Sequence, residues 1–365
     1  MVKVMEIKNI IKNKKCSGCM SCVNICPKAA IKIEKIDGFE YPYIDEEICI
    51  KCGKCNIACP IINKLEEKQY LQKVYAAKNK NTDIRMQSSS GGIFTLVAEW
   101  VLENNGVVFG AKFNDKLEVV HDYIENKEQI ELLRGSKYLQ SKIGLSYSKV
   151  KEFLENGRKV LFTGTPCQIE GLLSFLNKKY DNLYTQDIVC HGVPSPLVWK
   201  KYLEYKKFPK QINFRNKEQT GWTNYQVQYK YESNKELVDH KKDSYMKLFL
   251  KNLDLRESCY SCSFKKIIRN SDITIADFWG INAVNAEFND EKGISAIIIN
   301  SEKGLEIFNK INSKIEFIEE DIKNIIKYNS CICNSAAYNE KRKEFFEELK
   351  ENDFEYIMKK YLENN

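Results

Sequence analysis

The sequence predicts a small α+β domain joined to a larger α/β domain with a mixed sheet. Two observations indicate this fold class. A dense cysteine pattern lies within the first 60 residues and occurs there twice, and the chain beyond it alternates short apolar strands with amphipathic helices. We therefore expect domains at residues 1–65 and 66–330, followed by a C-terminal helical segment at residues 331–365.

The composition is that of a protein that buries a core. The 365 residues are 43% hydrophobic, and the net charge of +7 comes from lysines mixed with acidic residues, so we expect no nucleic-acid partner. No apolar run approaches the roughly 20 residues that span a bilayer, and the basic N-terminus lacks the apolar segment of a signal peptide. We expect a cytoplasmic protein without a membrane span, whose 14 cysteines are reduced and serve a purpose other than disulfides.

Two cysteine runs define the first domain. CSGCMSCVNICP at residues 16–27 and CIKCGKCNIACP at residues 49–60 share the spacing C-x2-C-x2-C-x3-C-P. Zinc sites use C-x2-C pairs but need neither the third cysteine nor the final proline. The spacing is that of bacterial ferredoxins, in which the fourth cysteine of one run ligates the other [4Fe–4S] cluster. It predicts a ferredoxin-like two-cluster domain, with one cluster on Cys16, Cys19, Cys22 and Cys59 and the other on Cys49, Cys52, Cys55 and Cys26.

The residues around the cysteines predict the local backbone of this domain. Gly18 and Gly53 ease the turn of each cysteine loop, and we expect each fourth cysteine to open a helix that crosses to the other cluster. Between the runs, apolar and polar residues alternate around Asp37-Gly38, which predicts a hairpin. Two clusters in series pass single electrons, so a redox partner is expected elsewhere.

Residues 61–73 are polar and predict a linker or short helix, after which strands and helices alternate. We expect a meander inserted at about residues 211–240 and two lysine- and glutamate-rich helices at the end of the chain. The predicted strands are 73–79, 107–113, 117–124, 158–166, 182–190, 271–280 and 294–300, and the predicted helices are 91–106, 127–134, 146–157, 167–179 and 195–208.

Further cysteines follow predicted strands of the larger domain. Cys167 and Cys190 come directly after two apolar strands, and Cys259 and Cys262 form a C-x2-C pair. Because ligands in open α/β sheets bind beyond the carboxyl ends of strands, these four thiols could hold a third [4Fe–4S] cluster. The alternatives are a zinc site from the same four, or Cys167 and Cys190 as small buried side chains. Cys331 and Cys333 are interpreted as structural or incidental.

A cofactor that joins single-electron to two-electron chemistry is also expected, and flavin does this. The candidate cradle for the flavin phosphates is a serine–glycine loop that precedes a helix N-terminus, which is an anion site for a pyrophosphate. Serine–glycine helix starts are also ordinary caps. Thr165 lies in a second tight turn at a helix start. Lys137 is a candidate charge partner for flavin, or else a surface lysine. The cradle consists of Ser89, Ser90, Gly91 and Gly92.

His191 is a candidate for the chemistry at the same strand ends. Beside Cys190, it could give a proton to the reduced substrate, or it could form a structural hydrogen bond. Arg215, Trp222 and Asp277 are further candidates for residues that line the site.

Together, several motifs resemble the coenzyme F420 hydrogenase/dehydrogenase beta-subunit family, in the form with an N-terminal two-cluster ferredoxin segment. The resemblance implies a flavin-binding α/β domain with one FAD, clusters that pass electrons to or from it, and hydride exchange with a substrate on the flavin. It assigns Ser89, Ser90, Gly91, Gly92, Lys137 and Thr165 to the flavin, and favours Cys167, Cys190, Cys259 and Cys262 as cluster ligands. The motifs are SSSGGIF, GSKYLQS, VLFTGTPCQIEGL, DIVCHGVPSP, FRNK with a following GW, and SDITIADFWG.

The sequence therefore predicts an iron–sulfur flavoprotein oxidoreductase. Electrons would move between a ferredoxin-like donor or acceptor, the clusters, FAD, and a small-molecule substrate or deazaflavin-type coenzyme. The alternatives are an electron-transfer subunit that feeds a partner enzyme, and an iron–sulfur scaffold whose α/β part binds a ligand. No motif selects a deazaflavin site, and a homo-oligomer is compatible with the sequence.

Overall fold

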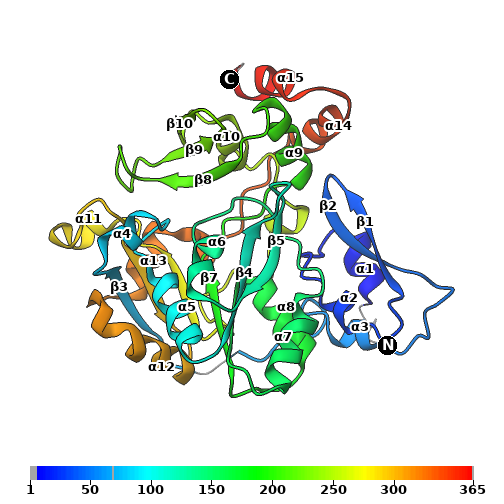
Figure 1. The fold of residues 1–365 in the computed structure, drawn as a ribbon. Helices are drawn as coiled ribbons and strands as arrows, with labels where there is room; N and C mark the ends of the chain where they lie inside the picture. Colours follow the sequence, from blue (N-terminus) through cyan, green and yellow to red (C-terminus); the bar gives the residue numbers. More distant parts are fainter. Residues whose placement is uncertain (1–5, 68–69, 364–365) are drawn as a thin grey trace.

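The computed structural model describes residues 6–67 and 70–363 of the chain, so the part of the expected linker at residues 68–69 lies outside the described residues. Its centre is an eight-stranded mixed sheet with a small cysteine-rich unit at one side (Figure 1). The strand order is β13 (Ile315–Glu319), β3 (Lys73–Asn79), β12 (Ser295–Ile299), β11 (Ile273–Asp277), β7 (Leu183–Ile188), β6 (Val160–Gly164), β4 (Val107–Phe113) and β5 (Val119–Ile124).

The four central strands of this sheet, β11, β7, β6 and β4, are parallel, and the strands outside them pair antiparallel. Alternate residues of β4 and β6 enter different cores. Val108 and Leu161 pack with α5 (Ile93–Glu103) and α12 (Glu302–Ile311). Phe109 and Phe162 pack with α7 (Ser146–Glu155) and α8 (Pro166–Leu176). The predicted α/β class with a mixed sheet is therefore confirmed, and the parallel strands end together at one edge.

The cysteine-rich unit contains α1 (Ile7–Lys12), α2 (Ser21–Ile25), α3 (Lys54–Ile57) and the hairpin of β1 (Ile31–Ile36) and β2 (Phe39–Ile44). The turn falls at Asp37-Gly38, as predicted, with positive φ at both residues. The expectation that each fourth cysteine opens a helix is wrong. Cys26 instead ends α2 with an extended backbone, because a residue before proline is disfavoured in the helical region.

A second sheet lies over one end of the molecule, beside the C-terminal helices (Figure 1). It is the antiparallel meander of β8 (Gln211–Asn216), β9 (Gln226–Lys230) and β10 (Lys235–Asp239). Its apolar side chains share one core with residues of β2, α9 (Pro196–Tyr205), α10 (Ser244–Leu250), α14 (Arg342–Glu351) and α15 (Phe354–Met358). The C-terminal helices, the meander and the cysteine-rich unit therefore contribute to one common core.

The edge strand β13 was not among the predicted strands. Only its first residue is buried, so its sequence lacks the continuous apolar run that marks the central strands. The remaining short helices are α4 (Thr82–Met86), α6 (Ile130–Leu133), α11 (Ile281–Val284) and α13 (Ile322–Tyr328). Within the described ranges, no helix has both the length and the apolar character needed to cross a bilayer.

A buried carboxylate in the loop after α10 makes stability depend on pH. Asp254 is fully buried, and no other described residue donates a hydrogen bond to its carboxylate oxygens. Burial raises the pKa of Asp254 to about 8. In the unfolded chain its pKa is about 4, so between about pH 4 and pH 8 the folded state keeps a proton that the unfolded state has lost. Stability therefore falls as the pH rises through this range.

We expect Asp254→Asn to remove this dependence. Between pH 5 and pH 8, the wild type should lose about 3 kcal/mol of unfolding free energy that the variant keeps. Anoxic chemical unfolding, followed by tryptophan fluorescence at both pH values, measures the difference. The control is Glu347→Gln at an exposed carboxylate, which should leave the pH dependence unchanged. A variant that follows the wild type across this range would contradict the prediction.

Candidate functional site

Three cavities are each lined by four cysteines. The first contains Cys16, Cys19, Cys22 and Cys59, and the second contains Cys26, Cys49, Cys52 and Cys55. The structure thus brings together the two predicted sets, each with three thiols from one run and the fourth from the other. Gly18 and Gly53 both have φ of +73°, which permits the tight loops between the thiols.

The third cavity is lined by Cys167, Cys190, Cys259 and Cys262. Cys167 lies in the first turn of α8 after β6, and Cys190 follows β7. These strands are neighbours and parallel, so their carboxyl ends place both thiols at one edge of the sheet. Cys259 and Cys262 come from a short 3-10 turn at Glu257–Ser261 and the residue that ends it.

Burial raises the pKa of the Cys19 and Cys190 thiols to about 12 and the pKa of the Cys259 thiol to about 11. In the described part of the chain, no group of three or more His, Cys, Asp or Glu side chains is placed to hold a metal ion. The thiols instead surround cavities, four to each. Four thiols around one cavity are the donor set of a [4Fe–4S] cluster, so the residues fit that group.

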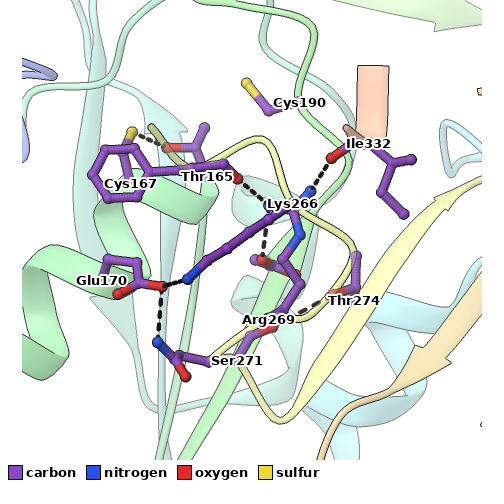
Figure 2. A network of polar contacts seen from close by, with 12 residues as sticks. Thr165, Cys167, Glu170, Cys190, Lys266, Arg269, Ser271, Thr274 and Ile332 are labelled. Carbon is purple, nitrogen blue, oxygen red and sulfur yellow. Dashed lines mark hydrogen bonds and ion pairs between the residues drawn. The ribbon is translucent and has the colours of Figure 1, made fainter. Parts of the chain in front are cut away.

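A polar network orders the segment that follows Cys262 (Figure 2). Lys266 lies 3.5 Å from the carboxylate of Glu170, and Arg269 donates to the carbonyl of Ile332 over 3.0 Å. Beside them, the hydroxyl of Thr165 and the thiol of Cys167 are 3.1 Å apart (Figure 2). These contacts fix the backbone that carries two walls of the third cavity.

Arg256 joins the cysteine-rich unit to the larger domain. It is fully buried, and its guanidinium donates to the carbonyls of Cys16 and Glu40 over 2.8 and 3.0 Å. It also donates to the side chain of Gln140 over 2.9 Å and lies 4.1 Å from the ring of Tyr41. Three fixed donors on one buried cation hold the first cysteine loop against the residues that precede Cys259.

A larger cavity of about 460 Å³ lies at the carboxyl ends of the central strands. The turn after β6, the end of β7 and the loops before α5 and after α6 form its walls. Of the residues predicted for the flavin site and for proton donation, those that line it are Ser89, Ser90, Gly92, Lys137, Thr165 and His191.

The serine–glycine loop is held by contacts that leave the start of α5 free of side-chain caps. Ser89 Oγ accepts from the backbone N–H of Ser136 over 2.7 Å, and Ser90 Oγ donates to the carbonyl of Ile294 over 2.7 Å. The N-cap of α5 is Gly92, with φ of +78° and no side-chain hydrogen bond. The serines therefore do not cap this helix, and its N-cap and first residues, Gly92, Ile93 and Phe94, line the cavity.

Gly91 does not line the cavity, and its backbone lies tightly against the neighbouring strands β3 and β12. A Cβ on it would lie 2.5 Å from the carbonyl oxygen of Ala77 and 2.7 Å from the backbone nitrogen of Ser295. Lys217 also holds this loop, because its buried ammonium donates to the carbonyls of Ser90 and Arg85 over 3.1 and 2.7 Å. The loop is therefore seated against β3 and β12 with no space for a side chain.

The four cavities form a series, because neighbouring cavities share residues. Ile7 lines both N-terminal cavities, and Ser17 and Ile61 line both the first and the third. Cys190, His191, Gly192 and Val193 separate the third cavity from the large one and line both. A continuous series of cavities thus runs from the cysteine-rich unit to the strand ends.

Comparison with known proteins agrees with this geometry. Residues 157–324 match the family model for the C-terminal part of the coenzyme F420 hydrogenase/dehydrogenase beta subunit, and residues 15–61 and 41–91 match two models of 4Fe-4S dicluster domains. Residues 157–324 therefore form the C-terminal domain of the coenzyme F420 hydrogenase/dehydrogenase beta subunit, in a chain that also carries a 4Fe-4S dicluster segment. The dicluster match covers both cysteine runs.

Two curated relatives extend the comparison. The chain is 25% identical over 318 residues to the coenzyme F420-dependent sulfite reductase of Methanocaldococcus jannaschii, covering 85% of this chain and 48% of that protein. It is 24% identical over 176 residues to a subunit of the F(420)H(2) dehydrogenase of Methanosarcina mazei, covering 45% of this chain and 49% of that protein. The chain therefore spans about half the length of these relatives.

A solved structure shares the fold of this chain. It is a chain of the F420-reducing [NiFe] hydrogenase complex from Methanosarcina barkeri, with a TM-score of 0.50 and 17% identity. The match covers 79% of this chain and 94% of that chain.

His191 and Lys137 are both partly occupied by contacts within the chain. His191 Nε2 donates to Asn252 Oδ1 over 2.6 Å, and burial lowers the pKa of the imidazole, so the neutral ring keeps Nδ1 as its remaining nitrogen. Lys137 donates to three carbonyls of its own loop, at Leu132, Arg134 and Gly135. Burial lowers the pKa of Lys137 to about 7.

Arg215 and Asp277 line the large cavity as a forked ion pair, with contacts of 3.0 and 3.1 Å. Trp222 does not line the cavity and instead donates to Asp277 Oδ1 from behind over 2.9 Å. The guanidinium of Arg215 also donates to the hydroxyl of Tyr138 over 3.1 Å. Its Nε is buried without a hydrogen-bond partner in the described residues.

The lining residues that were missing from the predicted site include His121, Gln186 and Cys331. His121 is held between Ser141 and the carbonyl of Thr163, and burial lowers its pKa to about 4. Gln186 is 2% exposed, and its Oε1 has no partner in the described residues. Cys331, interpreted as structural or incidental, also lines the cavity. For Gln186, a polar residue in the carboxyl half of the apolar strand β7, this position was an available signal.

Proposed function

We propose that this chain is an iron–sulfur flavoprotein oxidoreductase with two N-terminal [4Fe–4S] clusters, a third [4Fe–4S] cluster and one FAD. It would pass electrons between a ferredoxin-like partner and a small-molecule substrate or deazaflavin-type coenzyme. The observation that carries the proposal is the series of three four-cysteine cavities that ends at the large cavity. When bound, FAD supplies the exchange between single electrons and hydride.

The serine–glycine end of the large cavity suits the phosphates of FAD. The uncapped N-terminus of α5 presents N–H groups and the positive end of a helix dipole. The side chains of Arg134 and Lys137 line the same region, where cations attract phosphate. Gln186 Oε1 and Arg215 Nε supply one acceptor and one donor that have no described protein partner. The residues present therefore fit the group.

The partition at residues 190–193 suits electron transfer between the third cluster and the flavin. Gly192 keeps it thin, because a Cβ there would lie 2.9 Å from the side chain of Leu255. His191 stands on the partition with Nε2 donating to Asn252, so Nδ1 of the neutral ring can accept a proton but cannot donate one. We propose that His191 orients the substrate and accepts a proton, rather than acting as a donor at neutral pH.

The relatives support a deazaflavin-type coenzyme as the substrate, because two of them are named for coenzyme F420 or its reduced form. They also favour a second function, that of an electron-transfer protein feeding a partner enzyme, since one relative is part of a multi-subunit dehydrogenase. Both functions use the same row of cavities. They differ in whether this chain alone oxidises or reduces a substrate.

We expect anoxically purified protein to contain about 12 iron atoms and one flavin per chain. Dithionite-reduced ferredoxin should reduce the flavin, and reoxidation by coenzyme F420 would support the enzyme over the electron-transfer protein. Iron, acid-labile sulfide and released flavin are measured on the same sample. About eight iron atoms would remove the third cluster, and protein without flavin would contradict the flavoprotein assignment.

A further inference from the structure

The ammonium of Lys265 lies at the partition between the third cavity and the large one. It donates to the carbonyls of Cys190, Cys331 and His191, the last two over 2.8 and 3.3 Å. Cys190 and His191 line both cavities, Cys331 lines the large one, and Lys265 itself lines the third. One half-buried cation therefore touches backbone that belongs to both cavities.

The charge of Lys265 is not balanced by a carboxylate. Its three hydrogen bonds go to carbonyls, and no carboxylate among the described residues lies within ion-pair distance. The next residue differs: Lys266 lies 3.5 Å from Glu170 and 3.6 Å from Glu67, and Figure 2 shows it directed at Glu170. Lys265 is therefore a free positive charge between two cavities, whereas Lys266 is paired.

This charge lies beside the thiols of the third cavity. Lys265 donates to the carbonyl of Cys190 and lines the cavity together with Cys190 and Cys259. A cation that favours the thiolates favours any added negative charge at the same place, and it does so more strongly where water is excluded. Each electron that enters a cluster or a flavin adds such a charge.

We infer that Lys265 is a positioning residue that holds the partition and supplies a countercharge shared by the third cluster and the flavin, so that it raises both reduction potentials together. The inference rests on the proposed function, because it needs both groups in their cavities. Hydrogen bonds and charges around a cluster are known to set its potential. A countercharge shared by the two groups shifts both potentials in the same direction, so it eases reduction of both while changing the driving force between them little.

The test is an anoxic redox titration of the holoprotein, with clusters followed by electron paramagnetic resonance and flavin by absorbance. For Lys265→Gln we expect about a tenfold fall in the equilibrium constant for reducing the third cluster, which is about 59 mV for one electron. The flavin potential should fall in the same variant, and the N-terminal clusters should not move. Lys265→Arg, which keeps charge and donors, should restore both potentials.

Lys200 gives the control, because it is an exposed lysine of α9 that lines none of the four cavities. Lys200→Gln should leave the potentials of the third cluster and of the flavin unchanged. Unchanged potentials in Lys265→Gln with full iron and flavin would overturn the inference, as would failure of the arginine variant to restore them. If Lys265→Gln loses the third cluster, the flavin potential decides alone: a fall supports the shared countercharge, and no fall overturns it.

The wild type separates this inference from the proposed function. About eight iron atoms per wild-type chain would contradict both the third cluster and the shared countercharge. About 12 iron atoms per wild-type chain, with unchanged reduction potentials in Lys265→Gln, would contradict the shared countercharge alone.

Discussion

Cys259→Ser should cost about four iron atoms per chain while the N-terminal clusters stay intact. Cys259 lines only the third cavity, and the two N-terminal cavities take no residue from the turn that carries it. A serine hydroxyl keeps its proton at neutral pH and cannot replace a thiolate. The lost cluster lies between the N-terminal pair and the large cavity, so reduction of the flavin by ferredoxin should also fail.

Iron determination and low-temperature electron paramagnetic resonance measure this effect. The control is Cys333→Ser, since Cys333 is half-buried and lines none of the four cavities. That variant should keep the iron content of the wild type. Unchanged iron in Cys259→Ser, or equal losses in both variants, would count against a third cluster on these thiols.

The N-terminal cavities were the most predictable part of the site, because their geometry is local. Seven residues of sequence fix three thiols around a tight loop, and the doubled spacing pairs each loop with the last cysteine of the other run. The prediction that each fourth cysteine begins a helix was wrong. At Cys26 a helix ends instead, because the following proline disfavours the helical backbone at the residue before it. The motif therefore predicts the donor set better than the backbone between donors.

The third cavity depends on long-range order that the sequence indicates only indirectly. Cys167 and Cys190 meet because β6 and β7 pair in parallel, which follows from the predicted class of sheet. That Cys259 reaches them depends on Arg256, a buried cation with partners more than 100 residues away along the chain. No spacing rule signals such a contact. Cys331 is likewise brought to the large cavity by tertiary packing alone.

Gly91→Ala should remove flavin and leave iron in place. A Cβ on Gly91 would meet the backbone of β3 at Ala77 and of β12 at Ser295, within 2.5 and 2.7 Å. Backbone atoms of two strands that are paired on both sides cannot move aside, so the serine–glycine loop must shift instead. Such overpacking typically costs about 1–3 kcal/mol. Because the loop carries the start of α5, we expect the flavin Kd to rise by about tenfold or more, since about 1.4 kcal/mol is a factor of ten.

Flavin content after desalting and a fluorescence titration with added FAD give the size of this effect. Gly157→Ala is the control, because Gly157 has a φ of +74° but open space around it, so the substitution strains the backbone without displacing a neighbour. Its flavin affinity should match the wild type. Full iron with weak flavin binding in Gly91→Ala separates the two cofactor sites. Normal flavin binding in that variant would mean that the loop before α5 does not hold the cofactor, and the large cavity would then need another occupant.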